Sequence, residues 1–190
     1  MFCSDDCLIS ARKGQHGASC AALLRFHELK ESLNLSDAMF TNFLRVIDFV
    51  STFGTQQLLD FPSSQAPSND LLGRYMDLCW HRSDQEPRIT SMCAKIIGHC
   101  FQLSEEEVEK VAPLCCRMVL IDQANTYSIE HATLLPGDAM ETSHIAYATY
   151  LGAALMNHSC DPNVVSSFHL KTLVLRVTRP VAKGEQLFNR

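Results

Sequence analysis

The sequence has 190 residues, of which 46% are hydrophobic and 19% are charged, and its formal net charge is -5. This length and composition are typical of a globular chain with a sizeable hydrophobic core. The acidic charge, without any basic run, gives no electrostatic support to a nucleic-acid surface, so we expect no nucleic-acid partner. No apolar run approaches the roughly 18–20 residues of a membrane span, and no signal-peptide pattern opens the chain, so we expect no membrane partner.

Cysteine is unusually frequent in this chain. The cysteines are odd in number, and no secretion signal accompanies them. We therefore expect reduced thiols, some of them ligating a metal, in the cytoplasm or the nucleus, and no disulfide framework. The nine cysteines stand at positions 3, 7, 20, 79, 93, 100, 115, 116 and 160.

The first predicted helix spans residues 21–33, where leucines occur among good helix formers. A second helix is predicted after Ser36-Asp37, a typical N-cap, and it ends at Gly54, which suits a C-cap. Residues 61–70 are rich in Pro, Ser and Asn and predict a loop. The apolar residues at helical spacing in the second helix are Phe40, Phe43, Leu44, Ile47 and Val50.

Further helices are predicted over Leu71–Trp80 and Arg88–Phe101. The second of these has an apolar stripe on one side, formed by Ile89, Met92, Cys93, Ile96, Ile97 and Cys100. Ser104 and Glu107 form a capping box, which opens another helix. Pro113 either kinks this helix or restarts it. The chain up to about residue 120 is therefore predicted to be mostly helical.

Short strands are predicted after the helices. Residues 127–129, 164–170 and 173–177 alternate or are β-branched, and Lys171-Thr172 is placed to turn a hairpin between the last two runs. Helices come first and strands follow, so the expected fold class is α+β.

Four soft metal ligands lie close together near the N-terminus: Cys3, Cys7, His16 and Cys20. Thiolate and imidazole suit tetrahedral zinc, so this cluster predicts zinc binding. One alternative is that these are scattered members of a cysteine-rich chain. Another is a single improvised site that uses all four residues.

The most specific motif is Asn-His-Ser-Cys-Asp-Pro-Asn at residues 157–163. Asn157 and His158 offer hydrogen-bond donors and acceptors at fixed angles, which suits the binding of a polar ligand. Asp161-Pro162-Asn163 has the composition of a turn and lets the segment fold back on itself. The alternative is that these residues form a polar surface loop without a function. Any dipeptide of the motif would suit such a loop, but the complete seven-residue run between two apolar stretches does not.

This run is followed by Gly184-Glu185-Gln186-Leu187-Phe188, and together they resemble the signature of SET-domain protein lysine methyltransferases. The resemblance is greatest to the SET-and-MYND branch of that family. Within this branch, the member-4-like proteins are the candidate relatives. The resemblance implies an α+β fold with a partial SET β-core, a mostly helical insert and a residual MYND zinc-finger half. It assigns residues 1–20 to the C-terminal half of the finger, residues 21–120 to the helical insert and residues 121–190 to the SET core.

The resemblance also implies site residues and ligands. Asn157 and His158 bind S-adenosylmethionine, His81 is a candidate pocket residue, and Cys160 ligates zinc together with cysteines of a tail. The partners implied are a protein substrate with a target lysine and a proline-rich peptide. The residues that match the second half of the finger, and would ligate its zinc, are Cys3, Cys7, His16 and Cys20.

The resemblance places the family's catalytic tyrosine directly after Arg190, and it places the first finger ligands and the N-terminal SET strands before Met1. We therefore expect the 190-residue chain to be a piece truncated at both ends and inactive by itself. The alternative, from another functional class, is a non-catalytic protein-interaction module derived from a SET-and-MYND protein.

Overall fold

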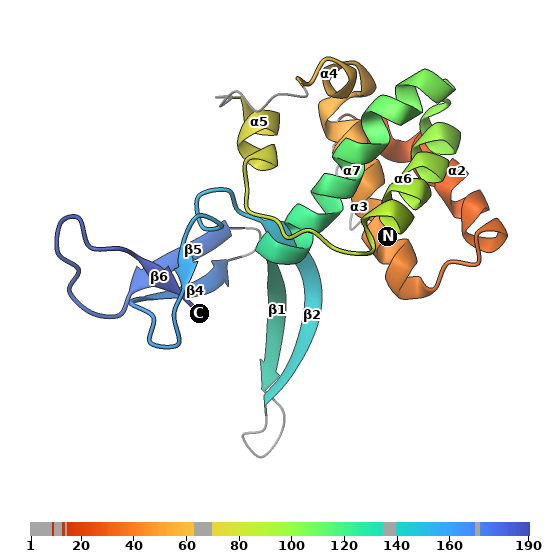
Figure 1. Ribbon diagram of the computed structural model, residues 1–190. Helices are drawn as coiled ribbons and strands as arrows, with labels where there is room; N and C mark the ends of the chain where they lie inside the picture. Colours follow the sequence, from red (N-terminus) through yellow and green to blue (C-terminus); the bar gives the residue numbers. More distant parts are fainter. Residues whose placement is uncertain (1–8, 10–12, 14, 63–69, 135–139, 170–171) are drawn as a thin grey trace. The chain divides into compact units, whose positions relative to one another are not determined.

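The computed structural model describes residues 9, 13, 15–62, 70–134, 140–169 and 172–190 (Figure 1). The chain divides into two compact units. The first is helical, and the second carries all the described strands. This confirms the predicted mixture of helices and strands. None of the described helices is both long and apolar enough to cross a membrane.

The first unit consists of Met1–Met76 and Trp80–Ile121. Its first described helix begins six residues before the predicted one. The helix predicted over Leu71–Trp80 is shorter than expected, and most of the predicted loop at 61–70 lies outside the described residues. The helices are α2 (Gln15–Ser32), α3 (Asp37–Phe53), α4 (Thr55–Leu59), α5 (Leu71–Met76), α6 (Glu86–Phe101) and α7 (Glu105–Asn125), whose last residues belong to the second unit.

The helix caps predicted at Ser36, at Gly54 and at Ser104–Glu107 are confirmed. The Ser36 hydroxyl accepts a hydrogen bond from the Met39 N–H at 3.3 Å, which caps α3. Gly54 ends α3 with φ of 79°, a backbone conformation that glycine adopts without strain. At the start of α7, the Ser104 N–H donates to the Glu107 carboxylate at 2.8 Å, and the Glu107 N–H donates to the Ser104 hydroxyl at 3.4 Å. This is the reciprocal pattern of a capping box.

The core of the first unit lies where α2, α3 and α6 pack together. Phe26 of α2 is fully buried, and its ring stacks on Phe40 of α3 with 4.7 Å between ring centroids. The apolar stripes predicted for α3 and α6 face this core, so hydrophobic burial holds the helices together. The most deeply buried residues of α3 and α6 are Val46, Ile47, Val50, Cys93, Ile96, Ile97 and Cys100, and all of these except Val46 belong to the predicted stripes.

Helix α7 continues through Pro113 to Asn125. Proline lacks an N–H, so the carbonyl of Glu109 has no helical partner at this point. Pro113 lies on the exposed side of the helix, where water can satisfy that carbonyl. The helix therefore neither restarts nor ends at Pro113.

Two groups of cysteines differ in exposure. Cys93, Cys100, Cys115 and Cys116 are buried. Burial raises the pKa of the Cys100 thiol to about 12 and raises the pKa of Cys93 and Cys115 above the range in which thiolates form in neutral solution. The exposed described cysteines are Cys20, Cys79 and Cys160.

We expect this difference to control alkylation of the folded chain. With iodoacetamide at about pH 8, where an exposed thiol is partly ionised, Cys79 and Cys160 should react quickly. Cys93 and Cys115 should react only after the chain is unfolded in urea, because they are buried and their pKa is raised. Peptide mass spectrometry at several reaction times measures this order. Equal rates at Cys93 and Cys160 in the folded chain would contradict the burial of Cys93.

The second unit consists of Asp77–Cys79 and Asp122–Arg190. Its described strands form two-stranded sheets. Strands β1 and β2 are antiparallel, with a bulge between Ile129 and Glu130; β4 and β5 are antiparallel; β3 and β6 are parallel. The strands are β1 (Thr126–Leu134), β2 (Met140–Thr149), β3 (Asn157–His158), β4 (Val164–His169), β5 (Thr172–Val177) and β6 (Phe188–Asn189).

The β4–β5 pairing confirms the predicted hairpin, and β1 confirms and extends the predicted run at 127–129. Strand β2 was not predicted, because its residues (METSHIAYAT) include few β-branched side chains and no clear alternation. Most of β2 from Thr142 onward is exposed. Its extended conformation follows from pairing with β1, from Thr126 opposite Thr149 onward, and that pairing is a tertiary effect.

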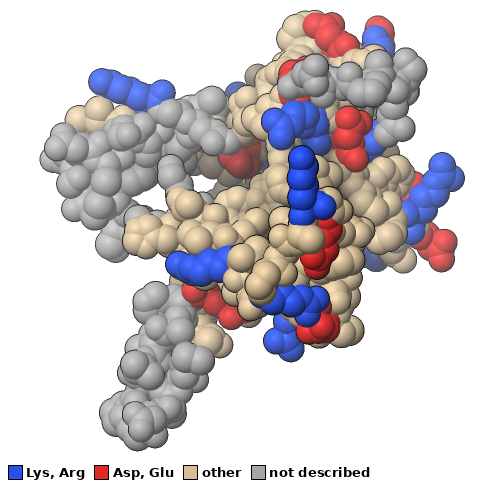
Figure 2. Space-filling model, turned by 90° about the vertical axis from the view of Figure 1, so that its left-hand side faces the viewer, with Lys and Arg blue, Asp and Glu red and all other residues tan. Residues whose placement is uncertain are grey.

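Charged side chains are spread over the surface. On the face drawn in Figure 2, acidic and basic residues are interspersed. The ion pairs of Lys110 with Glu106 and of Arg179 with Asp161 are exposed. Exposed pairs contribute little to stability, so burial and backbone pairing explain the fold better than surface charge does.

Candidate functional site

The motif at 157–163 begins with the short strand β3. Asn157 lies opposite Phe188, and His158 lies opposite Asn189, in a parallel pair with β6. The Ser159 N–H donates to the Asn189 carbonyl at 2.9 Å and continues the pairing. The side chains of Asn157 and His158 are exposed. Two segments that the sequence singles out separately are thus hydrogen-bonded to each other.

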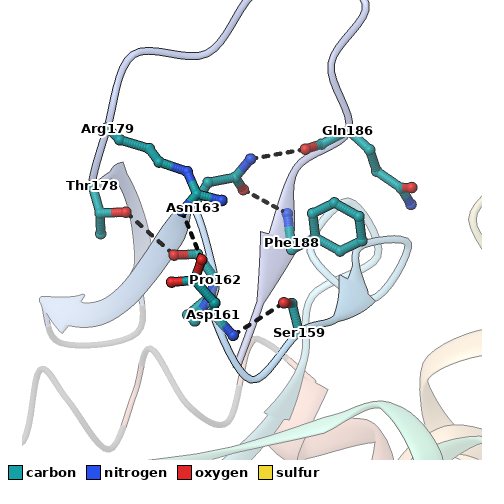
Figure 3. A network of polar contacts seen from close by, with 8 residues as sticks. All are labelled: Ser159, Asp161, Pro162, Asn163, Thr178, Arg179, Gln186 and Phe188. Carbon is teal, nitrogen blue, oxygen red and sulfur yellow. Dashed lines mark hydrogen bonds and ion pairs between the residues drawn. The ribbon is translucent and has the colours of Figure 1, made fainter.

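Asn163, the last residue of the motif, joins it to the segment before β6 (Figure 3). Its side chain is only 1% exposed. The carboxamide Nδ2 donates to the Gln186 carbonyl at 2.9 Å, and Oδ1 accepts from the Phe188 N–H at 2.8 Å. One side chain therefore satisfies two backbone groups of residues 186–188 and fixes this segment against the motif.

The turn between β3 and β4 is held by hydrogen bonds drawn in Figure 3. The Asp161 N–H donates to the Ser159 hydroxyl at 3.1 Å, and the Thr178 hydroxyl donates to the Pro162 carbonyl at 3.3 Å. Arg179 pairs with the Asp161 carboxylate at 2.9 Å. These contacts agree with the turn that Asp161-Pro162-Asn163 predicts.

A pocket of about 330 Å³ lies within the second unit, beside β1, β3 and β6. This volume is at the lower end of the range of roughly 300–1,000 Å³ for small-molecule sites. His158 lines the pocket, but Asn157, its exposed neighbour on β3, is not among the lining residues. The polar lining residues include Asn125, Tyr127, Ser128, His158, Asn189 and Arg190.

Two lining residues, Asn125 and Asn189, have no predicted role from the sequence. Asn125 donates from Nδ2 to the Cys79 carbonyl at 2.6 Å, which ties residues 77–79 to the start of β1. Asn189 is 8% exposed and donates to the Tyr127 hydroxyl at 3.0 Å. The resemblance extends to the Asn-x-aromatic-x-Ile run that contains Asn125 and Tyr127, but no pattern in the sequence indicates the partner of Asn189.

A cluster of Ser128, His144 and Glu130 lies on the β1–β2 hairpin. The Ser128 hydroxyl is 2.5 Å from His144 Nδ1, and the Glu130 carboxylate is 3.5 Å from the same nitrogen. A serine–histidine–acid triad instead needs the serine and the acid on opposite nitrogens of the ring. This cluster therefore does not have the geometry of a nucleophilic triad.

The predicted metal ligands are only partly described. Cys3 and Cys7 lie outside the described residues, and His16 lies in α2 but its side chain is not described. Cys20 is exposed, and the exposed Cys160 has its Sγ 3.6 Å from His158 Nε2. Within the part of the chain that the structure describes, no three His, Cys, Asp or Glu side chains are grouped to hold a metal. Zinc binding and the finger half at residues 1–20 thus stay predictions.

His81 lies in the first unit and is exposed, whereas every residue that lines the pocket belongs to the second unit. His81 and His158 therefore belong to different units. The role of His81 as a pocket residue stays a prediction, as does cofactor binding by Asn157 and His158.

Comparison with known proteins gives one family. A search of curated proteins found no significant match. A family model described as the SET domain matches residues 26–190, which takes in the end of α2, the later helices, the motif at 157–163 and both strands of the parallel pair. Since this match covers most of the sequence, the chain belongs to the SET-domain family.

Proposed function

We propose that the second unit binds S-adenosylmethionine through Asn157 and His158, and that the chain derives from a lysine methyltransferase of the SET-and-MYND kind. SET domains have a methyltransferase-type fold, and those that are methyltransferases generally use this cofactor on protein lysines. The observation that carries the proposal is the parallel pairing of Asn157-His158 with Phe188-Asn189, beside a polar pocket that His158 lines.

The side chains present fit the cofactor chemically. The Asn157 carboxamide supplies both donors and an acceptor, which matches an ammonium and a carboxylate, and the His158 imidazole supplies one of each when neutral. Both side chains are exposed, so a ligand can reach them. Behind them, Asn163 holds the backbone of residues 186–188, so the site has a fixed frame before a ligand arrives.

The cofactor, when bound, supplies the electrophilic methyl group. The protein has to bind the cofactor and the lysine substrate, orient them toward each other and exclude water. A lysine amine has an ordinary pKa of about 10.4, so it must lose a proton before it attacks. Asn157 and His158 serve the first of these tasks, the binding of the cofactor. Holding the methyl donor and the lysine amine in the right geometry can lower the activation barrier of methyl transfer by roughly 7–11 kcal/mol, and a rigid pocket provides this contribution.

Calorimetric titration of S-adenosylhomocysteine, the demethylated product, into the 190-residue chain tests the proposal. Saturable binding of one molecule per chain is the expected result. Adenosine and methionine, titrated separately, serve as controls and should bind more weakly, because each engages only part of the site. Absence of heat at millimolar ligand, with unchanged backbone NMR signals around residues 157–159 and 188–190, would overturn the proposal.

Two finer parts of the proposal rest on the sequence and on its resemblance to the family. One is zinc binding by Cys3, Cys7, His16 and Cys20 and, separately, by Cys160; the other is a proline-rich peptide partner for residues 1–20. The odd number of cysteines, without a secretion signal, favours the cytoplasm or the nucleus as the site of action.

We expect the 190-residue chain to bind zinc substoichiometrically, with fewer than about two tightly held ions per chain, because structural zinc sites need about four protein ligands. Elemental analysis of protein purified without added metal measures this. Two or more tightly held zinc ions would show that the ligands group differently. The Cys160→Ser variant is the control for a contribution from the motif, and Cys20→Ser is the control for the N-terminal cluster.

A further inference from the structure

The hydroxyl of Tyr127 connects three segments of the chain that line the pocket. It accepts a hydrogen bond from Asn189 Nδ2 at 3.0 Å and donates one to the Ala153 carbonyl at 3.2 Å. Tyr127 belongs to β1, Asn189 to β6 and Ala153 to the segment before β3, and all three line the pocket. A single oxygen atom therefore joins three segments that are distant in the sequence.

The ring that carries this hydroxyl is held by aromatic contacts. Tyr127 meets Tyr150 edge to face, with 5.9 Å between centroids and 76° between planes. Tyr150 in turn lies 6.2 Å from Phe168 of β4. Edge-to-face pairs of this kind are favourable, so a phenylalanine ring at position 127 would keep the same place without the hydroxyl.

Asn189 connects the Tyr127 hydroxyl to the motif. Its backbone pairs with His158, its carbonyl accepts the Ser159 N–H, and its side chain is almost fully buried. A buried carboxamide that loses its partner is costly, so it turns or shifts to find another. A shift of Asn189 would move His158, because the two residues share one parallel bridge.

We propose that Tyr127 is a positioning residue for His158, acting through the hydrogen bond between its hydroxyl and the side chain of Asn189. The resemblance asks only for an aromatic residue at this position, so the role of the hydroxyl is a separate property of this chain. The part of the inference that concerns ligand affinity rests on the proposed cofactor site; the part that concerns the placement of His158 does not.

The test is the Tyr127→Phe variant of the 190-residue chain, titrated with S-adenosylhomocysteine. We expect its affinity to fall about five- to thirtyfold, the range for loss of one partly buried hydrogen bond. Tyr147→Phe is the matched control: Tyr147 is 53% exposed on β2 and does not line the pocket, so its affinity should not change. An unchanged affinity in Tyr127→Phe, with normal binding by the unsubstituted chain, would overturn the inference.

A double-mutant cycle separates positioning from direct contact. If Tyr127 acts through Asn189, then Asn189→Ala and the double variant Tyr127→Phe/Asn189→Ala should bind equally weakly. Additive losses would mean that the hydroxyl touches the ligand itself, and they would overturn the positioning role.

NMR of the ligand-free chain decides the inference independently of the proposed function. In Tyr127→Phe, the side-chain amide signals of Asn189 and the imidazole signals of His158 should move, and they should stay in place in Tyr147→Phe. If the unsubstituted chain binds no S-adenosylhomocysteine but these signals move, the proposed function fails and the positioning role stands. If the signals do not move, the positioning role fails whatever the affinity.

Discussion

Replacement of Asn163 by alanine is expected to lower the free energy of unfolding of the second unit by about 1–3 kcal/mol. The substitution removes two part-buried hydrogen bonds, to the Gln186 carbonyl and from the Phe188 N–H, and each contributes roughly 0.5–1.5 kcal/mol. Whole domains are stable by only about 5–15 kcal/mol, so this loss is large. The side chain is 1% exposed, which leaves little room for water to replace it.

Hydrogen exchange measured by mass spectrometry checks this expectation region by region. Peptides covering residues 157–169 and 184–190 should exchange faster in Asn163→Ala, whereas peptides from α3 and α6 in the first unit should not change. Asn163→Asp is an informative second variant, because it keeps the acceptor for the Phe188 N–H but places a carboxylate against the Gln186 carbonyl. Unchanged exchange around β6 in both variants would contradict the role of Asn163 as the link between motif and strand.

Asn157→Ala is expected to weaken binding of S-adenosylhomocysteine about tenfold or more. Loss of one hydrogen-bonding group that a ligand buries costs roughly 1–3 kcal/mol, and about 1.4 kcal/mol is a factor of ten. His158→Ala should weaken binding by a similar factor. Because both side chains are exposed in the ligand-free chain, the free energy of unfolding should stay nearly the same.

Calorimetry of the two variants measures the loss, and thermal unfolding measures stability in parallel. Asp161→Asn is the matched control within the same motif: Asp161 is exposed and pairs with Arg179 on the surface, so its affinity should equal that of the unsubstituted chain. Asn157→Ala should therefore lower the affinity for S-adenosylhomocysteine without changing stability, whereas Asn163→Ala should lower the stability of the second unit. Full affinity in Asn157→Ala would remove this residue from the cofactor site.

The sequence by itself determined those features that depend on residues close together along the chain. Ser36, Gly54 and the Ser104–Glu107 pair mark helix ends because a cap needs only the three or four neighbouring residues. The apolar stripes of α3 and α6 and the β4–β5 hairpin follow from local periodicity in the same way. The motif at 157–163 was recognisable because seven specific residues stand in one run.

Only the tertiary structure decided how distant segments pair. Strand β2 has a weak strand pattern and becomes extended because β1 offers it hydrogen-bonding partners. The parallel pair of β3 and β6 is too short to show any periodicity, and the roles of Asn163, Tyr127 and Asn189 depend on partners more than twenty residues away. An asparagine reads as a turn residue from local sequence, and whether it is instead a buried link depends on which backbone groups the fold brings to its side chain.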